Sequence, residues 1–297
     1  MSFTGGPVDA GGLIDLGGSS APSPRRERRR IPPGEALRSL AVGAASTVVV
    51  FGILGWIVVN SPGWAAVQAS FFDPTWFAYS LPEVVDAFTV NVQLFAIAEV
   101  LILVLGLVVA VLRGIPGPAF FPVRLIATVY ADLFRAVPGV LIIYLLGFGI
   151  PTLDLPGMPT EPFVYAVAAL ALVYSAYVSE VYRAGIESVH PSQEAAARSL
   201  GLTRFQAMRY VVLPQAVRRV IPPLLNDFIG LQKDTVLVSY IGVVEIFRQA
   251  QIIQAAKFNF TPYLAVALVF VVITIPLARL TDWLVARDRR RAAAVAR

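Results

Sequence analysis

Apolar residues along the chain form long runs that are separated by shorter polar segments. The runs cover residues 39–60, 88–112, 124–148, 162–182, 221–243 and 262–285. A helix needs about 20 residues to cross the hydrocarbon core of a bilayer, which is about 30 Å thick. Every run meets that length, so the pattern predicts an all-α membrane protein with six transmembrane helices.

Composition supports a membrane protein and excludes several kinds of site. The 297 residues are 57% hydrophobic and 14% charged, with a mean hydropathy of +0.72, whereas soluble domains are about 25% charged. The chain has no cysteine, which excludes disulfides and thiolate metal sites. A single histidine, His190, argues against a histidine-based metal or catalytic site. We therefore expect no catalytic residue, no metal ligand and no cofactor held by this chain.

The two ends differ in composition from the apolar runs. Residues 1–35 are rich in Gly, Ser and Pro and end in RRERRR, which predicts a disordered, basic cytoplasmic tail. Residues 36–87 are expected to form an additional first transmembrane helix and an external loop. The first run also resembles a signal peptide, but it is longer than the usual apolar region of about 7–15 residues. Residues 88–287 are predicted to be the core domain, and 288–297 a second basic cytoplasmic tail.

Arginine placement predicts the orientation of the spans. The loops 61–87 and 149–161 contain acidic residues but no Lys or Arg, whereas basic residues are concentrated before the first run, between the fourth and fifth runs, and after the sixth. Because cytoplasmic loops carry an excess of Lys and Arg, both termini are predicted to be cytoplasmic. Membrane orientation is therefore preferred to nucleic-acid binding as the explanation of the net charge of +5.

The polar segment between the fourth and fifth runs has the signals of two short helices. Pro191 and Ser192 suit a helix start, and Gly201 suits its end. Thr203 and Gln206 have the spacing of a capping box for a second helix, expected to end at Pro214. Such a helix pair either rests on lipid headgroups as an amphipathic segment or docks into a soluble partner.

Several motifs in this region resemble ABC importer permeases of the polar amino acid uptake family. The cytoplasmic loop of these permeases reads E-A-A-x3-G-x9-I-x-L-P, and Gly201, Val211 and Leu213-Pro214 match its spacing, with Ala195 in the glutamate position. FRAVP (134–138), SAYVSEVYRAGIESV (175–189) and the segments 211–229 and 231–246 resemble further family motifs. Within the last segment, Gln232 stands where a leucine is more usual. The resemblance covers residues 88–287.

The resemblance implies a type I importer permease in the plasma (bacterial inner) membrane. It implies a dimer with a second copy or a related permease, two ABC ATPase subunits that bind ATP and Mg²⁺, an extracytoplasmic substrate-binding protein and an amino-acid substrate. It also implies that the segment 192–200 is a coupling helix, docked in a groove of the ATPase. The coupling-loop candidates are Ser192, Glu194, Ala195, Ala196, Ala197, Arg198, Ser199, Leu200, Gly201, Leu213 and Pro214.

Ionisable and amide side chains inside the runs are candidates for a translocation path, because such groups are costly in lipid and usually face a cavity or a partner. For Asp132 with Arg135 and for Glu180 with Arg183, local ion pairs are preferred to direct substrate contact. Lys233 is expected to find a partner on another helix, within an interhelical polar network. The path candidates are Asn91, Glu99, Asp132, Arg135, Glu180, Asn226, Asp227, Lys233, Asp234 and Thr235.

A third set of polar residues follows the fifth run on the predicted outer side. Glu245, Arg248 and Gln249 are candidates for docking the binding protein, or else belong to a solvated amphipathic turn. The predicted function is that of the permease subunit of an ATP-driven importer of polar amino acids or related small solutes. An ion-coupled secondary transporter, in which the embedded carboxylates couple the ion, is the alternative, and a structural or sensor membrane protein is a third.

Overall fold

The computed structural model describes the backbone of residues 33–295, with side chains described for residues 38–287 and for Arg290. The predicted tail at 1–35 lies outside the described residues except for its last three, which begin a helix. The described chain is helical and contains no strand. Its α-helices are α1 (Pro33–Val59), α2 (Trp64–Phe71), α3 (Pro74–Gly114), α4 (Phe121–Ala136), α5 (Gly139–Tyr144), α6 (Ile150–Thr152), α7 (Pro162–Glu187), α8 (Pro191–Ser199), α9 (Arg204–Ala207), α10 (Leu213–Asp234), α11 (Ile246–Lys257) and α12 (Thr261–Val295).

Shorter helical turns of other kinds connect some of these helices. They are the 3₁₀ turns η1 (Pro118–Phe120) and η4 (Thr235–Ile241), and the π-helical turns η2 (Leu145–Gly149) and η3 (Met208–Val212). The chain divides into two compact units, residues 1–62 and 63–297. The first contains α1, whose apolar length agrees with the predicted first span.

Four helical stretches of the described chain are long and apolar enough to cross a membrane: Arg38–Val59, Trp64–Gly114, Pro162–Glu187 and Thr261–Arg287. The number rises to six if two bent pairs each count as one span. These pairs are Pro118–Ala136 with Gly139–Thr152, bent by 106°, and Arg204–Ile241 with Ile246–Lys257, bent by 48°. The third predicted run is therefore bent within its length, and the fifth ends at a bend.

Proline explains the bend in the third run. Pro138 lies between α4 and α5, and the backbone of Val137 before it is extended, with ψ at 131°. A residue that precedes proline is disfavoured in the helical region because the proline ring crowds it. The helix therefore ends at Ala136 and restarts at Gly139 in another direction.

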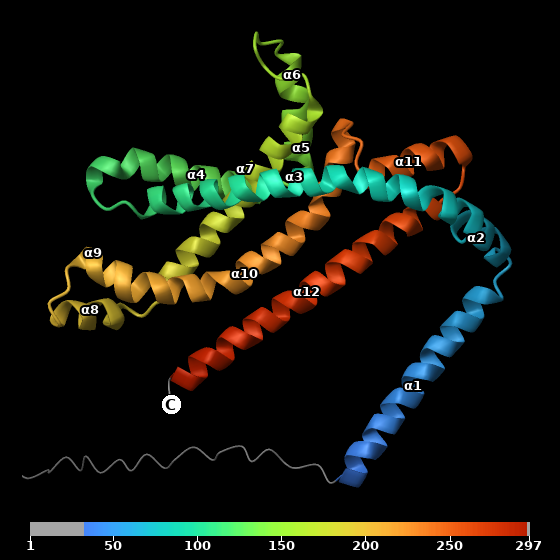
Figure 1. The fold of residues 1–297 in the computed structure, drawn as a ribbon, viewed down its shortest axis with the longest axis horizontal. Helices are drawn as coiled ribbons and strands as arrows, with labels where there is room; N and C mark the ends of the chain where they lie inside the picture. The colour runs from blue at the N-terminus through green and yellow to red at the C-terminus, as the bar shows by residue number, and fades with distance from the viewer. Residues whose placement is uncertain (1–32, 296–297) are drawn as a thin grey trace, which may run out of the picture. The chain divides into compact units, whose positions relative to one another are not determined.

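The core of residues 63–297 is built around α3 and α7, which pack along one another (Figure 1). One face of α3 is buried at regular helical spacing, through Leu94, Ala98, Ile102, Gly106 and Ala110. A Cβ added at Gly106 would lie 2.7 Å from Cγ1 of Val178, so the glycine permits the close approach of α7. α4, α10 and α12 then pack against these two helices.

Helix α3 begins earlier than the apolar pattern indicated. The carboxylate of Asp73 accepts hydrogen bonds from the backbone N–H groups of Thr75 and Trp76, at 2.8 and 3.3 Å, and Pro74 occupies the first helical position. Aspartate at the cap and proline in the first turn both favour a helix start. The predicted external loop at 61–87 therefore contains α2 and the first turns of α3.

Candidate functional site

The polar segment forms a hairpin of two short helices, α8 and α9, at the start of α10 (Figure 1). Nδ1 of His190 accepts a hydrogen bond from the backbone N–H of Ser192 at 3.2 Å and thereby caps α8. Gly201 follows with φ at +89°, a left-handed conformation that glycine adopts without strain. The predicted helix start and glycine stop are thus both confirmed.

The predicted capping box at the start of α9 is also confirmed. The backbone N–H of Gln206 donates to Oγ1 of Thr203 at 3.3 Å, and the N–H of Thr203 donates to Oε1 of Gln206 at 2.9 Å. Together these bonds satisfy two of the free N–H groups at a helix start. Both turns of the hairpin therefore arise from local hydrogen bonds.

The predicted end of the second helix at Pro214 is wrong. The chain stays helical from Arg204 through the π turn η3 into α10, with Leu213 and Pro214 as the first residues of α10. Proline has no N–H, and its ring clashes with the carbonyl four residues before it. The wider π turn immediately upstream accommodates this proline, as such turns do elsewhere in helices.

The hairpin exposes most of the side chains predicted for the coupling loop. Ala197 is buried, and Glu194 is partly buried and lies 3.8 Å from Nε of Arg204. Two large apolar side chains project from the hairpin: Leu200 is 82% exposed and Phe205 is 72% exposed. The other candidates on α8, namely Ser192, Ala195, Ala196, Arg198 and Ser199, are exposed as well.

Asn91, Thr235 and Glu245 meet in a buried polar cluster, which we call the Asn91 cluster. Nδ2 of Asn91 donates to Oγ1 of Thr235 and to Oε2 of Glu245, both at 3.0 Å, while Oδ1 of Asn91 accepts from the N–H of Ile246 at 3.0 Å. Glu245 also accepts from the N–H groups of Phe247 and Arg248 and so caps α11. The cluster ties α3 to the break between η4 and α11.

Burial of Glu245 corrects its assignment to the docking surface. Its side chain is fully buried and its carboxyl group is occupied by Asn91 and by the start of α11. Glu245 was expected to be exposed because it follows an apolar run, but it is buried because its side chain caps α11. Arg248 remains exposed, and Gln249 is partly exposed and donates to Oε2 of Glu83 at 3.3 Å.

Glu180 lies among three arginines that come from three helices. Its Oε1 is 2.7 Å from Nη1 of Arg113 and 3.1 Å from Nη1 of Arg135, and its Oε2 is 2.7 Å from Nη2 of Arg183. The predicted Glu180–Arg183 pair is confirmed. The predicted Asp132–Arg135 pair is wrong: no such ion pair exists among the described residues, because Arg135 turns to Glu180 and Asp132 is exposed.

The partner expected for Lys233 is also absent. Lys233 is exposed, and no ion pair to it occurs in the described part of the chain. Its neighbour Asp234 instead accepts a hydrogen bond from the hydroxyl of Tyr174 at 2.8 Å. The side chains of consecutive residues point about 100° apart on a helix, so Asp234 points inward while Lys233 points outward. The interhelical network forms, but without Lys233.

The remaining path candidates occupy different surroundings on α3 and α10. Glu99 and Asp227 are partly buried, and Oδ2 of Asp227 is buried without a hydrogen-bond partner. Asn226 is exposed and lines a cavity between α10 and α12, next to Thr281 and Asp282. The candidates thus do not all belong to one continuous site, although Glu99 on α3 lies within electrostatic range of Asp227 on α10. No group of three or more His, Cys, Asp or Glu residues that could hold a metal ion occurs among the described residues.

Sequence reasoning missed three contributors to these contacts. Arg113 and Tyr174 were not among the candidates, and Gln232 was noted only as standing where a leucine is more usual. Of these, Gln232 carried the clearest signal, since an amide replaces leucine within an apolar run. The tertiary partners of all three come from distant segments, which the pattern of one run does not show.

Comparisons with known proteins agree with this arrangement. Residues 102–290 match the model of a family described as binding-protein-dependent transport system inner membrane component. The chain is 38% identical over 176 residues to the probable glutamine ABC transporter permease protein GlnM of Bacillus subtilis (strain 168), covering 59% of this chain and 79% of the relative. It is 34% identical to the glutamate/aspartate import permease protein GltK of Escherichia coli O157:H7, covering 61% and 82%.

Solved structures show the same fold. A crystal structure of an amino acid ABC transporter with histidines superimposes with a TM-score of 0.67 and 34% identity, covering 72% of this chain and 98% of that one. An inward-facing MetNI methionine ABC transporter superimposes with a TM-score of 0.55 at 16% identity, which shows the fold alone. The fold is therefore that of type I importer permeases. The matched family and the apolar helices show a multi-pass protein of the plasma membrane. The chain therefore belongs to the binding-protein-dependent transport system inner membrane components and is an ABC permease of the polar amino acid type.

Proposed function

We propose that this chain is the membrane-spanning subunit of an ATP-driven importer that receives polar amino acids from an extracytoplasmic binding protein. The observation that carries the proposal is the exposed α8–α9 hairpin, with Leu200 and Phe205 projecting from a segment that matches the family's coupling loop. Large apolar side chains exposed on a short polar hairpin are typical of a protein-binding surface. An ATPase subunit is the partner that this family uses there.

Helix α10 provides a mechanical route from the hairpin to the membrane interior. The chain is helical without a break from Arg204 through η3 and α10 to Ile241. The same stretch contains Gln232 and Thr235, which contact α12 and α3 through hydrogen bonds. A displacement of the hairpin by a closing ATPase dimer would therefore be carried along α10 into the helix bundle, as a rigid-body movement.

The partly buried carboxylates of Glu99 and Asp227 support a role in the translocation path. Ionisable groups inside a membrane protein usually face a water-filled cavity or bind a substrate. Asp234, held by Tyr174, lies on the same helix as Asp227. These groups suit the ammonium group of an amino acid, whereas the Glu180 cluster and the Asn91 cluster are satisfied internally and hold helices together.

The outer end of the bundle is proposed to receive the binding protein. Arg248, with its side chain exposed and bonded to Gln251 at 3.1 Å, and Gln249, bonded to Glu83, remain candidates for this surface. Their place at the start of α11 puts them at the opposite end of the α10–α11 segment from the hairpin (Figure 1). This separation fits a docking surface on one side of the membrane and an ATPase surface on the other, with both termini in the cytoplasm.

The proposed complex contains two ATPase subunits and two permeases, which are either two copies of this chain or this chain and a related one. ATP and Mg²⁺ are bound by the ATPases, because the sequence has no G-x-x-x-x-G-K-[ST] phosphate loop. This chain then carries no enzyme activity, holds no cofactor and does not bind nucleic acid. Its own task is to open a path alternately to the two sides of the membrane.

The test is a substitution in the hairpin with a matched control. Gly201 and Gly157 both have positive φ, at +89° and +84°, and a Cβ at either would meet no atom within 4 Å. Gly201→Arg should lower ATP-driven uptake of labelled amino acids into proteoliposomes by at least about tenfold, because the hairpin no longer fits its partner. Gly157→Arg carries the same backbone strain outside the hairpin and should keep uptake within about twofold of wild type. Equal uptake by both variants would contradict the proposed coupling role.

A further inference from the structure

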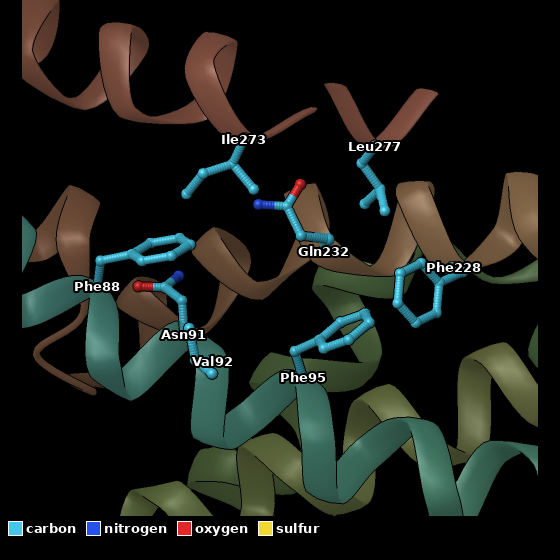
Figure 2. Close-up of a pocket in the computed structure, with 8 residues that line it drawn as sticks. All are labelled: Phe88, Asn91, Val92, Phe95, Phe228, Gln232, Ile273 and Leu277. Carbon is cyan, nitrogen blue, oxygen red and sulfur yellow. The ribbon is translucent and has the colours of Figure 1, made fainter. Parts of the chain in front are cut away.

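A cavity of about 220 Å³ lies between α3, α10 and α12 (Figure 2). Its walls are mostly aromatic and aliphatic: Phe88 and Phe95 come from α3, Phe228 from α10, and Ile273 and Leu277 from α12. The rings of Phe95 and Phe228 meet edge to face with centroids 4.5 Å apart. Pockets for drug-sized ligands are about 300–1,000 Å³, so this cavity suits a smaller group, such as one side chain of a solute.

Two amide side chains, Asn91 and Gln232, also line the cavity, but only one of them is free to bind. Both N–H groups of Asn91 are used, by Thr235 and Glu245, and its oxygen accepts from Ile246. Gln232 is different. Its Oε1 accepts from the hydroxyl of Thr274 at 3.1 Å, which fixes the amide, while its Nε2 is buried and has no hydrogen-bond partner.

The free nitrogen of Gln232 is an unusual feature for a buried group. The residue is only 7% exposed, and leaving a buried polar group without a partner destabilises the fold. In Figure 2 the amide lies between the α12 side chains and the aromatic side chains of α3, with its nitrogen directed into the space beside Phe88 and Ile273. Retention of such a group within an apolar wall indicates that a ligand supplies the missing acceptor.

The lining also limits the chemistry of that ligand. Gln232 offers N–H donors and no spare oxygen directed to the cavity, so a donor such as an ammonium group gains nothing there. No Lys, Arg, Asp or Glu side chain lines the cavity, and an unpaired charge is strongly disfavoured in apolar surroundings. The matching group is therefore an apolar stem that ends in an uncharged acceptor oxygen, of which a carboxamide is the simplest case.

We propose that Gln232 is a specificity-determining residue that donates a hydrogen bond from Nε2 to the side-chain carboxamide oxygen of the transported solute. The methylene groups of that side chain occupy the cavity that Phe88, Phe95 and Phe228 line. This inference rests on the proposed function, and it narrows the substrate class to amino acids with a neutral acceptor at the end of the side chain. A site that pairs a buried donor with its substrate rejects analogues that lack the acceptor.

The experiment measures binding to the intact permease–ATPase complex without its binding protein, so that selectivity arises in the permease alone. Equilibrium dialysis with labelled L-glutamine and L-methionine compares two side chains of similar length, of which only glutamine carries a strong acceptor. Gln232→Leu should lower the preference for glutamine over methionine by about tenfold, the loss expected for one hydrogen bond. Gln232→Glu keeps the size of the side chain while removing the donor in its ionised form, and should lower glutamine binding to a similar extent.

A matched control is Gln215→Leu, in which the lost amide belongs to α10 but bonds to the carbonyl of Val211 outside the cavity. Its glutamine preference should equal that of wild type. An unchanged preference in both Gln232 variants, each still co-purifying with the ATPase, would overturn the inference. So would native mass spectrometry that finds a phospholipid bound to wild type and lost from Gln232→Leu. Uptake assays separate this inference from the proposed function. If wild type takes up amino acids with ATP but the Gln232 variants keep the wild-type preference for glutamine, only this inference fails. If wild type takes up no amino acid, the proposed function fails as well.

Discussion

The α8–α9 hairpin and the Asn91 cluster lie on the same structural unit but are built in opposite ways. In the hairpin, the side-chain hydrogen bonds that cap the helices join residues two or three positions apart, as from Ser192 to His190 and between Thr203 and Gln206. In the Asn91 cluster, Asn91 bonds to Thr235 and Glu245, which follow it by 144 and 154 positions. The hairpin is exposed, whereas the cluster is buried.

This difference has consequences for stability and for function. Water can replace a hydrogen bond lost from the exposed hairpin, so damage there is local and inexpensive. The buried cluster has no such replacement, and the loss of one member leaves several groups without partners. A residue of the hairpin can therefore alter coupling with little effect on folding, while a residue of the cluster affects the whole bundle.

Glu245→Ala provides the largest expected effect. It removes the acceptor for Asn91 and for the N–H groups of Phe247 and Arg248, and should lower the free energy of unfolding by about 4 kcal/mol, given about 1–3 kcal/mol for each buried group left unsatisfied. Equilibrium unfolding in mixed detergent micelles measures this loss of unfolding free energy. Glu83→Ala is the control, because Glu83 joins the same two helices through one exposed bond to Gln249. Similar losses of unfolding free energy in the two variants would contradict the larger effect expected for the buried bonds.

Glu180→Gln tests a cluster of intermediate burial. The variant leaves Arg113, whose side chain is 11% exposed, beside Arg135 and Arg183 without a neutralising charge. We expect a loss of about 2 kcal/mol in the free energy of unfolding, below the about 3–5 kcal/mol for a fully buried broken pair, because Glu180 is partly open to solvent. Glu187→Gln removes an exposed pair with Arg183 and should change stability by less than about 0.5 kcal/mol. Thermal unfolding in detergent compares the two, and equal melting temperatures would contradict the prediction.

Thr203→Ala gives the smallest expected effect on the whole molecule. It removes one half of the capping box and should destabilise α9 by about 1 kcal/mol. Hydrogen exchange at the amides of Arg204–Ala207 should accelerate about fivefold, while exchange in α3 and α7 stays unchanged. Ser199→Ala is the control, since its hydroxyl donates to Ala196 within α8 and caps nothing. Faster exchange throughout the bundle would show that the hairpin is not a local unit.

Prediction from the sequence succeeded where local chemistry decides the structure. The capping box, the glycine stop and the apolar lengths of α1, α3, α7 and α12 were all visible in one stretch of chain at a time. It failed at Pro138 and Pro214, which look alike in the sequence. Pro138 ends α4, whereas Pro214 lies within a continuous helix because a π turn precedes it. The backbone just before each proline, extended at Val137 and a π turn at Met208–Val212, distinguishes these outcomes, and neither proline alone indicates which applies.

By itself, the sequence determined the class of the protein, its all-helical membrane character, and the hairpin whose turns follow from Gly201 and Thr203. Those features depend on the number of consecutive apolar residues and on backbone groups satisfied within a few residues. Only the tertiary structure decided that Glu245 lies inside, that Arg135 pairs with Glu180, that Lys233 is exposed, and that the amide nitrogen of Gln232 lacks a partner. Each of these depends on which distant segments surround a side chain, and hydrogen bonds and charges across helices are set by that packing.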